Sequence, residues 1–161
     1  MIVVADSSPL IVLVNIGHVD VLPRLFGRLL IPSQVSDELA ALNRPAAVRE
    51  FIRLKPDWLE IRDPAVIERI AGLHAGETSA IRLAVELKAD LLVIDERAGR
   101  KVASERGIAV VGTVGILERA ADLGLIDLAI AYDRIKCTDF WVNPQLLDES
   151  LQRHHARLGG P

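Results

Sequence analysis

Short apolar runs alternate along the chain with stretches of helical spacing. Ile2 to Ala5 and Leu91 to Ile94 are runs of four apolar residues beside polar or turn-forming residues, as is typical of buried parallel strands. Val35, Leu39 and Leu42 stand at i, i+4 and i+7, which is the spacing of one helix face. Because such strands alternate with such helices, the pattern predicts an α/β fold with a parallel sheet.

The same pattern places the remaining elements. Asp63 followed by Pro64 predicts a helix start, because aspartate is a good N-cap and proline suits the first helical position. The closing Gly-Gly-Pro is expected to fray. Further strands are expected at Arg28 to Ile31, Trp58 to Arg62 and Ile108 to Val111, and further helices at Leu10 to Ile16, around Ile81 to Val85, at Val114 to Leu123 and along an amphipathic tail from Asn143 to Leu158.

Composition bounds the class of protein. A chain of 161 residues is the length of one ordinary domain, so we expect a single domain over residues 1–161, with 143–161 as its C-terminal tail. No segment has the roughly 20 uncharged apolar residues of a membrane span, and Asp6 interrupts the apolar start, so we expect a cytoplasmic protein without a membrane partner. The single Cys137 excludes an intramolecular disulfide framework. The net charge of −3 means that nucleic-acid binding needs a local basic patch.

Four acids stand where strands end or helices begin. Asp6 and Asp95 each end a predicted strand, and ligands of open parallel sheets bind beyond the carboxyl ends of the strands. Glu38 and Glu77 are expected near helix starts, where unpaired N–H groups favour a carboxylate by about 0.3–1 kcal/mol. Each acid has a simpler interpretation as well: Asp6 and Asp95 as helix caps, Glu38 as a solvent-facing residue, and Glu77 as a favourable first-turn charge.

Taken together, the acids favour a metal site. Four carboxylates that share one pocket repel one another and raise at least one pKa, and a divalent cation removes that repulsion. Oxygen-only ligands suit Mg²⁺ or Mn²⁺ rather than zinc. A metal in such a site activates water and offsets charge on a leaving oxygen, which is the chemistry of phosphodiester hydrolysis.

Five motifs carry a family resemblance. They are V-A-D-S-S-P-L-I at 4–11, I-P-x-x-V-x-x-E-L at 31–39, G-E-T-S-A-I-x-L-A at 76–84, L-L-V-I-D-E-R-A-G-R-x-x-A at 91–103 and G-T-V-G-I-L at 112–117. In this order and spacing they resemble the PIN-domain family, in particular the prokaryotic subgroup related to VapC-type toxins, which has Gly-Glu at the third acidic position.

The resemblance implies a three-layer α/β/α fold with a parallel sheet in the order 3-2-1-4-5. It implies a metal-dependent ribonuclease, often the toxin of a toxin–antitoxin pair and commonly a homodimer, with RNA as substrate and an antitoxin protein as a possible partner. By position, Asp6, Glu38, Glu77 and Asp95 are the implied metal ligands and catalytic residues, and Ser7 supports them. The chain departs from many members at Ile94, where a hydroxyl residue is common before the fourth acid.

Other residues have two interpretations each. Arg97 and Arg100 follow Asp95 and are candidates to contact RNA phosphates, or they belong to a solvated helix in which Glu96 pairs with Arg100. Thr78 either bonds a carboxylate or supports a helix start. The aromatic residues Trp58, Phe140 and Trp141 either stack on bases or lie in the core. The apolar stretches Leu10 to Leu25 and Ile116 to Ile130 either form a dimer or antitoxin interface or are core helices.

The sequence therefore predicts a metal-dependent endoribonuclease of PIN type. One alternative is a catalytically silent PIN-fold module that binds nucleic acid or protein. A phosphatase-like or nucleotide-binding α/β enzyme is disfavoured, because the chain has no Asp-x-Asp after the first strand, no G-x-x-x-x-G-K-[ST] and no G-x-G-x-x-G.

Overall fold

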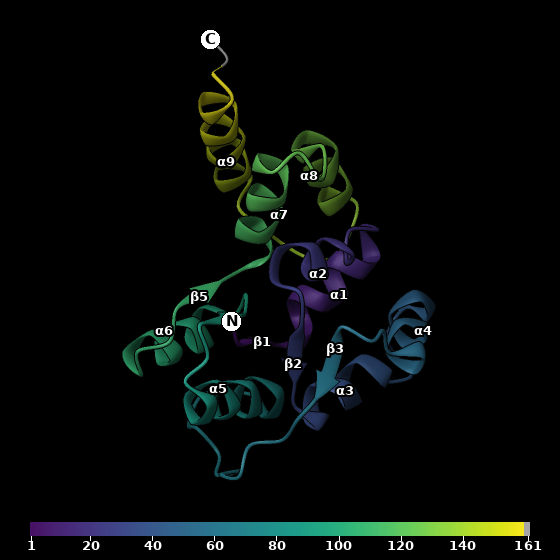
Figure 1. The fold of residues 1–161 in the computed structure, drawn as a ribbon. Coiled ribbons are helices and arrows are strands. Elements are labelled where there is room, and N and C mark those ends of the chain that lie inside the picture. The colour runs from purple at the N-terminus through teal and green to yellow at the C-terminus, as the bar shows by residue number, and fades with distance from the viewer. Residues whose placement is uncertain (160–161) are drawn as a thin grey trace.

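The computed structural model describes residues 1–159 (Figure 1), so the fraying expected at the C-terminal end concerns mainly Gly160 and Pro161, which lie outside the described residues. All strand pairings in the described part are parallel, and the sheet has the order β3-β2-β1-β4-β5. The predicted α/β/α fold and strand order are confirmed. The strands are β1 Val3–Ala5, β2 Leu29–Ile31, β3 Leu59–Ile61, β4 Leu91–Val93 and β5 Val110–Val111.

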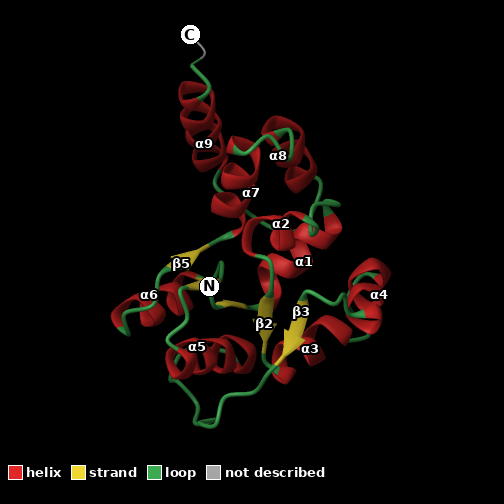
Figure 2. Cartoon of the chain, in the orientation of Figure 1, coloured by secondary structure: helices red, strands yellow, loops and turns green. Residues whose placement is uncertain are grey.

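Helices surround the sheet on both sides (Figure 2). The helices α2, α4 and α8 have no helix of their own in the sequence-based prediction. The helices are α1 Ser7–Asn15, α2 Val21–Phe26, α3 Ser33–Ala40, α4 Ala46–Leu54, α5 Ala75–Leu87, α6 Arg97–Glu105, α7 Thr113–Asp122, α8 Leu128–Lys136 and α9 Pro144–Arg157.

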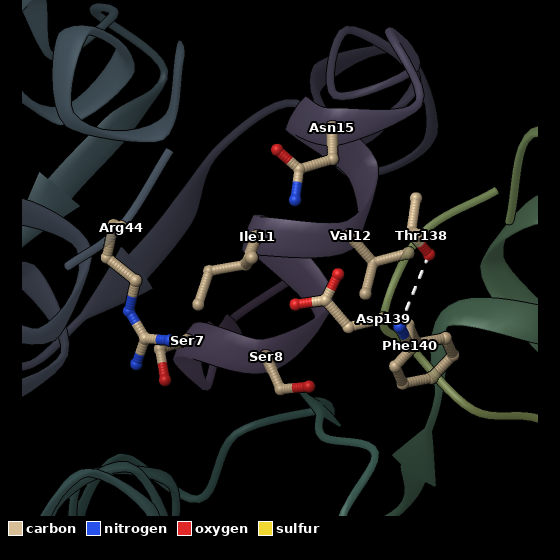
Figure 3. Close-up of a pocket in the computed structure, with 9 residues that line it drawn as sticks. All are labelled: Ser7, Ser8, Ile11, Val12, Asn15, Arg44, Thr138, Asp139 and Phe140. Carbon is tan, nitrogen blue, oxygen red and sulfur yellow. Dashed lines mark hydrogen bonds between the residues drawn. The ribbon is translucent and has the colours of Figure 1, made fainter. Parts of the chain in front are cut away.

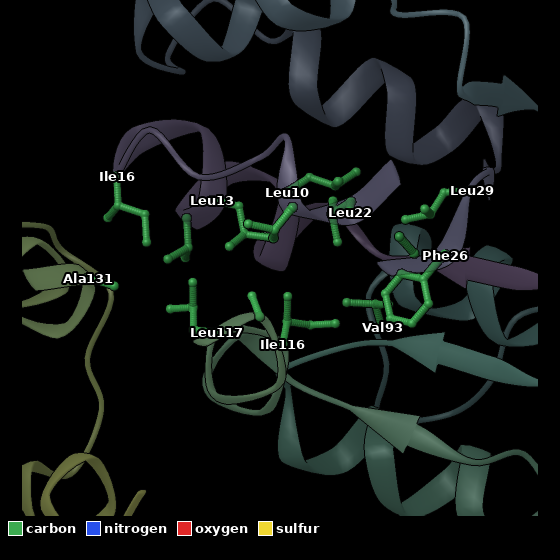
Figure 4. Packing of buried hydrophobic residues seen from close by; sticks show 14 of the residues in the cluster. Leu10, Leu13, Ile16, Leu22, Phe26, Leu29, Val93, Ile116, Leu117 and Ala131 are labelled. Carbon is green, nitrogen blue, oxygen red and sulfur yellow. The ribbon is translucent and has the colours of Figure 1, made fainter. Parts of the chain in front are cut away.

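Alternate residues of strands β1, β2, β4 and β5 point into two separate cores. Val3 and Ala5 of β1 belong to a large core, whereas Val4 between them belongs to a smaller one. This alternation follows from the pleat, which points successive side chains to opposite faces. Helices α1, α2, α3, α4, α7, α8 and α9 all contribute to the large core, in which side chains of α1 face those of α7 (Figure 4). Helices α5 and α6 cover the other face (Figure 1).

The central strands carry the candidate acids to one place. β1 and β4 are neighbours, with Ala5 paired to Val93. The Asp6 N–H continues this ladder by donating to the Val93 carbonyl at 2.9 Å. Asp6 and Asp95 therefore leave the sheet side by side at its carboxyl edge.

The predicted helix start at Asp63 and Pro64 is wrong. The Asp63 carboxylate instead accepts hydrogen bonds from the N–H and hydroxyl of Ser33 at 2.8 and 2.7 Å. It therefore stabilises the start of α3, which lies 30 residues earlier in the chain. The segment 62–74 has no helix and runs to α5, where Ile70 is buried in the smaller core. Asp63, which the sequence suggests as the N-cap of a helix that follows it, thus bonds a residue in a distant segment instead.

The two apolar stretches are mostly core. Leu10, Leu13 and Leu22 are fully buried, as is Leu117. Leu123 and Ile130 remain exposed beside them. Within residues 1–159, no helix combines the length and apolar character that crossing a membrane requires.

Candidate functional site

The four predicted acids lie at the carboxyl edge of the sheet, on four different elements. Asp6 directly precedes α1, and Asp95 follows β4. Glu77 stands in the first turn of α5, as predicted. Glu38 is near the end of α3, so its expected position at a helix start is wrong. Its carboxylate therefore gains nothing from the N-terminus of its own helix, and other groups must hold it.

Glycines bring these carboxylates close to neighbouring elements. The Glu38 carboxylate lies against Gly76, the residue just before Glu77, in the space that a Cβ would occupy. Asp95 Oδ1 is similarly placed over Gly112, only 2.7 Å from where a Cβ would stand. The glycines of the G-E and G-T motifs thus leave room for acids from other parts of the chain.

Gly76 offers a test of this close approach. We expect Gly76→Ala to fold normally, because alanine favours a helix over glycine by about 1 kcal/mol. The new methyl group must displace the flexible end of Glu38, so metal-dependent activity should fall at least tenfold. Ala75→Gly, at the residue just before Gly76, is the control, because it makes the opposite change in helix propensity. Gly107→Ala is unsuitable as a control, because Gly107 has φ +81°, where alanine is strained. Activity unchanged in Gly76→Ala would mean that Glu38 has no part in the site.

Asp6 is the most perturbed of the four acids. Its side chain is buried, its Oδ1 has no hydrogen-bond partner, and it makes no capping bond although it occupies the N-cap position of α1. Burial raises its pKa to about 7, opposed by the Ser7 amide and reinforced by the charges of Glu38, Glu77 and Asp95. That reinforcement places all four carboxylates within one electrostatic neighbourhood. The interpretation of Asp6 as a simple cap is not supported.

Glu77 and Asp95 are also perturbed, for the same main reason. Burial raises the pKa of Glu77, and its Oε2 has no partner in the protein. Burial likewise raises the pKa of Asp95, although bonds from Thr113 oppose the shift. The Thr113 N–H and hydroxyl each donate to Asp95 at 2.7 Å. Asp95 therefore bonds the first residue of α7 rather than capping α6.

Glu38 is held by Ser7, whose hydroxyl donates to Oε2 at 2.6 Å. With Glu38 tied to Ser7 and Asp95 tied to Thr113, the side chains do not form a closed cage. Within residues 1–159, no three His, Cys, Asp or Glu side chains are placed to hold one ion. The donor chemistry nevertheless fits a hard cation, because Asp6 Oδ1 and Glu77 Oε2 are buried oxygens without partners.

Of the residues predicted to assist the acids, Ser7 contacts one of the four carboxylates and the others have different surroundings. Ser7 contacts Glu38 as described, and the hydroxyl of Thr78 is buried without a partner. Arg100 does not take the expected helical pairing with Glu96 but donates to the Ile94 carbonyl at 3.3 Å, and its charge lowers the pKa of Asp95. Arg97 is exposed on α6.

A cavity of about 240 Å³ lies beside the first turn of α1. Figure 3 shows Arg44 and Asp139 on either side of Ser7 and Ser8, with the Asp139 carboxylate directed into the cavity. Sequence analysis did not single out Arg44, Asp139 or Thr113. Only Thr113 had a local signal, in the G-T motif, because the other two reach α1 solely through tertiary packing.

Comparisons with known proteins agree with this fold. A family model described as DUF3368: PIN domain matches residues 2–156. A solved structure, a PilT N-terminus domain protein from the hyperthermophilic archaeon Sulfolobus solfataricus P2, superimposes with a TM-score of 0.52 at 17% identity, over 74% of this chain and 93% of that one. At this identity the likeness concerns the fold. No curated protein gives a significant match.

Proposed function

The chain belongs to the PIN-domain family, and from that premise we propose that it is a divalent-metal-dependent endoribonuclease. PIN domains are generally nucleases and usually use divalent metals. The proposal adds the substrate, RNA, the cations, Mg²⁺ or Mn²⁺, and the residues that hold them: Asp6, Glu38, Glu77 and Asp95.

One observation carries the proposal. Two buried carboxylates, Asp6 and Glu77, each keep an oxygen without any partner at the edge of the sheet where Asp95 also emerges. Leaving a buried polar atom unpaired costs about 1–3 kcal/mol, and more when it carries charge. Structural acids normally gain hydrogen bonds from their surroundings, so unpaired oxygens beside other carboxylates point to a bound cation.

The surrounding residues have distinct tasks in this proposal. The bound cation supplies Lewis acidity, which activates water and offsets charge on the phosphate. Ser7 orients Glu38, and Thr113 orients Asp95, through the bonds described above. The basic residues nearest to Asp95 in the sequence are Arg97 and Arg100, one turn apart on α6, and Arg100 lies next to Asp95. In this proposal both arginines contact RNA phosphates.

The test combines cleavage with metal binding. Purified protein should cut labelled RNA in the presence of Mg²⁺ or Mn²⁺ and not in EDTA. Saturating metal, at about 100 times its Kd, should stabilise the fold by about 2.7 kcal/mol, or about 5–10 °C in Tm, because it binds only the folded state. Asp37→Asn, an exposed acid next to Glu38, should behave like the wild type. Absence of both effects would contradict the proposal.

A silent PIN-fold binding module is the second candidate. It is favoured by the bonds from Ser7 to Glu38 and from Thr113 to Asp95, which already satisfy two of the four acids without any cation. This candidate expects no metal-dependent rise in Tm and no cleavage, and it retains binding of RNA or protein.

We further propose that the protein is the toxin of a cytoplasmic toxin–antitoxin pair and that it acts as a homodimer. The support is the resemblance of its G-E-T-S motif to toxin-related PIN domains, together with the exposed Leu123 and Ile130 beside the core of α7 and α8. Light scattering should give twice the chain mass of 17.6 kDa. A monomer that is indifferent to the product of the adjacent reading frame would contradict both parts.

A further inference from the structure

A second and larger hollow begins at the candidate centre. It has a volume of about 1040 Å³, and Asp95 is part of its lining. The same lining includes Arg97 and Arg100 of α6, and Trp141 and Leu146 near the start of α9. A molecule bound at Asp95 would therefore continue naturally along this groove.

The Trp141 side chain is exposed to solvent, and hydrogen bonds and core contacts fix the backbone on either side of it. Its side chain is 79% exposed, whereas Phe140 and Val142 on either side pack against the large core. The Thr138 hydroxyl donates to the Ile135 carbonyl at 2.7 Å and accepts from the Phe140 N–H at 3.3 Å. The alternation of inward and outward side chains thus presents the indole ring without requiring the segment to be mobile.

The end of this segment is fixed as well. Asn143 Oδ1 accepts from the Gln145 N–H at 3.0 Å and caps α9, and Leu147 is buried in the large core. The indole therefore stands on a short connection anchored at both ends. An aromatic ring fixed in this way loses little conformational entropy when a flat partner stacks on it.

The lining of the groove carries both acidic and basic side chains. Asp95, Glu96 and Asp139 are its acidic residues. Of the arginines that line it, Arg153 is paired with Glu118 at 3.0 Å, whereas Arg97 makes no ion pair among residues 1–159. Basic side chains and an exposed aromatic ring in one groove are the usual combination for backbone contact and base stacking in single-stranded nucleic acid.

We propose that this groove binds the single-stranded RNA segment next to the scissile phosphate, with one base stacked on the Trp141 indole and its phosphates contacting Arg97 and Arg100. The inference rests on the proposed function and adds the path of the substrate. Stacking accepts any base, because every base has a π face, so recognition at Trp141 is expected to be tolerant of sequence. The groove requires an unpaired strand, since a base within a duplex has no free face.

The test measures stacking directly. The chain has two tryptophans, so Trp58→Phe leaves Trp141 as the sole indole. In a Trp58→Phe, Asp6→Asn background, which binds without cutting, hexaadenylate should quench the emission of Trp141. An abasic ribose-phosphate chain of the same length keeps the phosphates and should bind without comparable quenching.

Affinity is measured separately with fluorescein-labelled hexaadenylate. Trp141→Ala should weaken binding about 5- to 100-fold, and Trp141→Phe should restore most of it. Ile67→Ala, which changes an equally exposed apolar residue (80%) in the segment 62–74 and outside this groove, should leave the affinity within twofold. Because Trp141 is exposed, all variants should keep the Tm of the background protein.

The outcomes separate this inference from the proposed function. Stacking and binding without cleavage by the wild type in any metal would reject the nuclease and retain the groove. Cleavage by the wild type, with no quenching and no loss of affinity in Trp141→Ala, would reject the groove and retain the nuclease. A shift of Trp141 emission on self-association, with RNA affinity unchanged, would assign the ring to a protein interface and overturn the inference.

Discussion

Asp6→Asn is expected to abolish metal-dependent cleavage of RNA and, at pH 8 without metal, to raise the Tm. Loss of activity follows because asparagine has no charge to hold a cation, and we expect a decrease of at least a thousandfold. The gain in stability follows from the pKa of Asp6, which burial and three neighbouring acids raise from 3.8 to about 7. Each unit of such a difference corresponds to about 1.36 kcal/mol, so ionised Asp6 destabilises the fold by up to about 4 kcal/mol.

The pH dependence has a definite sign. The pKa is higher in the folded than in the unfolded chain, so the folded state binds the proton more tightly. Without metal, wild-type stability should fall as pH rises from about 4 to about 7 and then level off, and Asp6→Asn should lack this contribution. Thermal unfolding monitored by circular dichroism in EDTA, at several pH values, measures the difference.

Two comparisons make this result decisive. Asp37→Asn removes an exposed acid close by and should change neither activity nor the pH dependence. If the protein is a toxin, inducing the wild type should arrest bacterial growth and inducing Asp6→Asn should not. An active Asp6→Asn enzyme, or one markedly less stable than the wild type at pH 8, would show that Asp6 serves the fold rather than a cation.

The sheet and its two strand-end acids were predictable because the signals are local. Runs such as Leu91 to Ile94 identify buried strands, and parallel strands send their carboxyl ends to one edge. Asp6 and Asp95 then fall side by side once β1 and β4 are neighbours. That neighbour relation came from the family resemblance, because nothing in the two runs themselves specifies the strand order.

The remaining features of the site depend on contacts between distant segments. Glu38 was expected at a helix start, but α3 begins five residues earlier at Ser33, where Asp63 supplies the stabilising bond. The pairing of Asp95 with Thr113 joins residues 18 apart. Trp141 reads in the sequence as part of an apolar F-W-V run, and only packing shows that the middle ring faces outward.

Helix α9, which contributes Leu146 and Arg153 to the groove, depends on one partly buried acid. Glu118 of α7 exposes 12% of its side chain and accepts bonds from Ser150 and Arg153 at 2.7 and 3.0 Å and from Arg157, all on α9. Burial alone raises the pKa of Glu118, but the bonds from Arg153, Arg157 and Ser150 outweigh it and lower the pKa to about 2. The carboxylate therefore fastens α9 to α7 while it is ionised.

Glu118→Gln should lower the free energy of unfolding by about 1–3 kcal/mol at pH 7, a range reduced because both arginines are half exposed to solvent. The folded pKa lies below the ordinary value of 4.5, so this stabilisation is present above pH 4.5 and is lost as pH falls towards 2. Denaturant unfolding of wild type and variant should thus converge in that window.

Glu149→Gln provides the matched control, since Glu149 is an exposed acid on the same helix α9 and bonds only Gln145 among residues 1–159. It should change stability by less than about 0.5 kcal/mol. If Glu118→Gln behaved in the same way, with equal stability at pH 7 and at pH 3, α9 would be held chiefly by apolar contacts such as those of Leu147. The position of Trp141 at the start of this helix would then depend on core packing and not on the charge of Glu118.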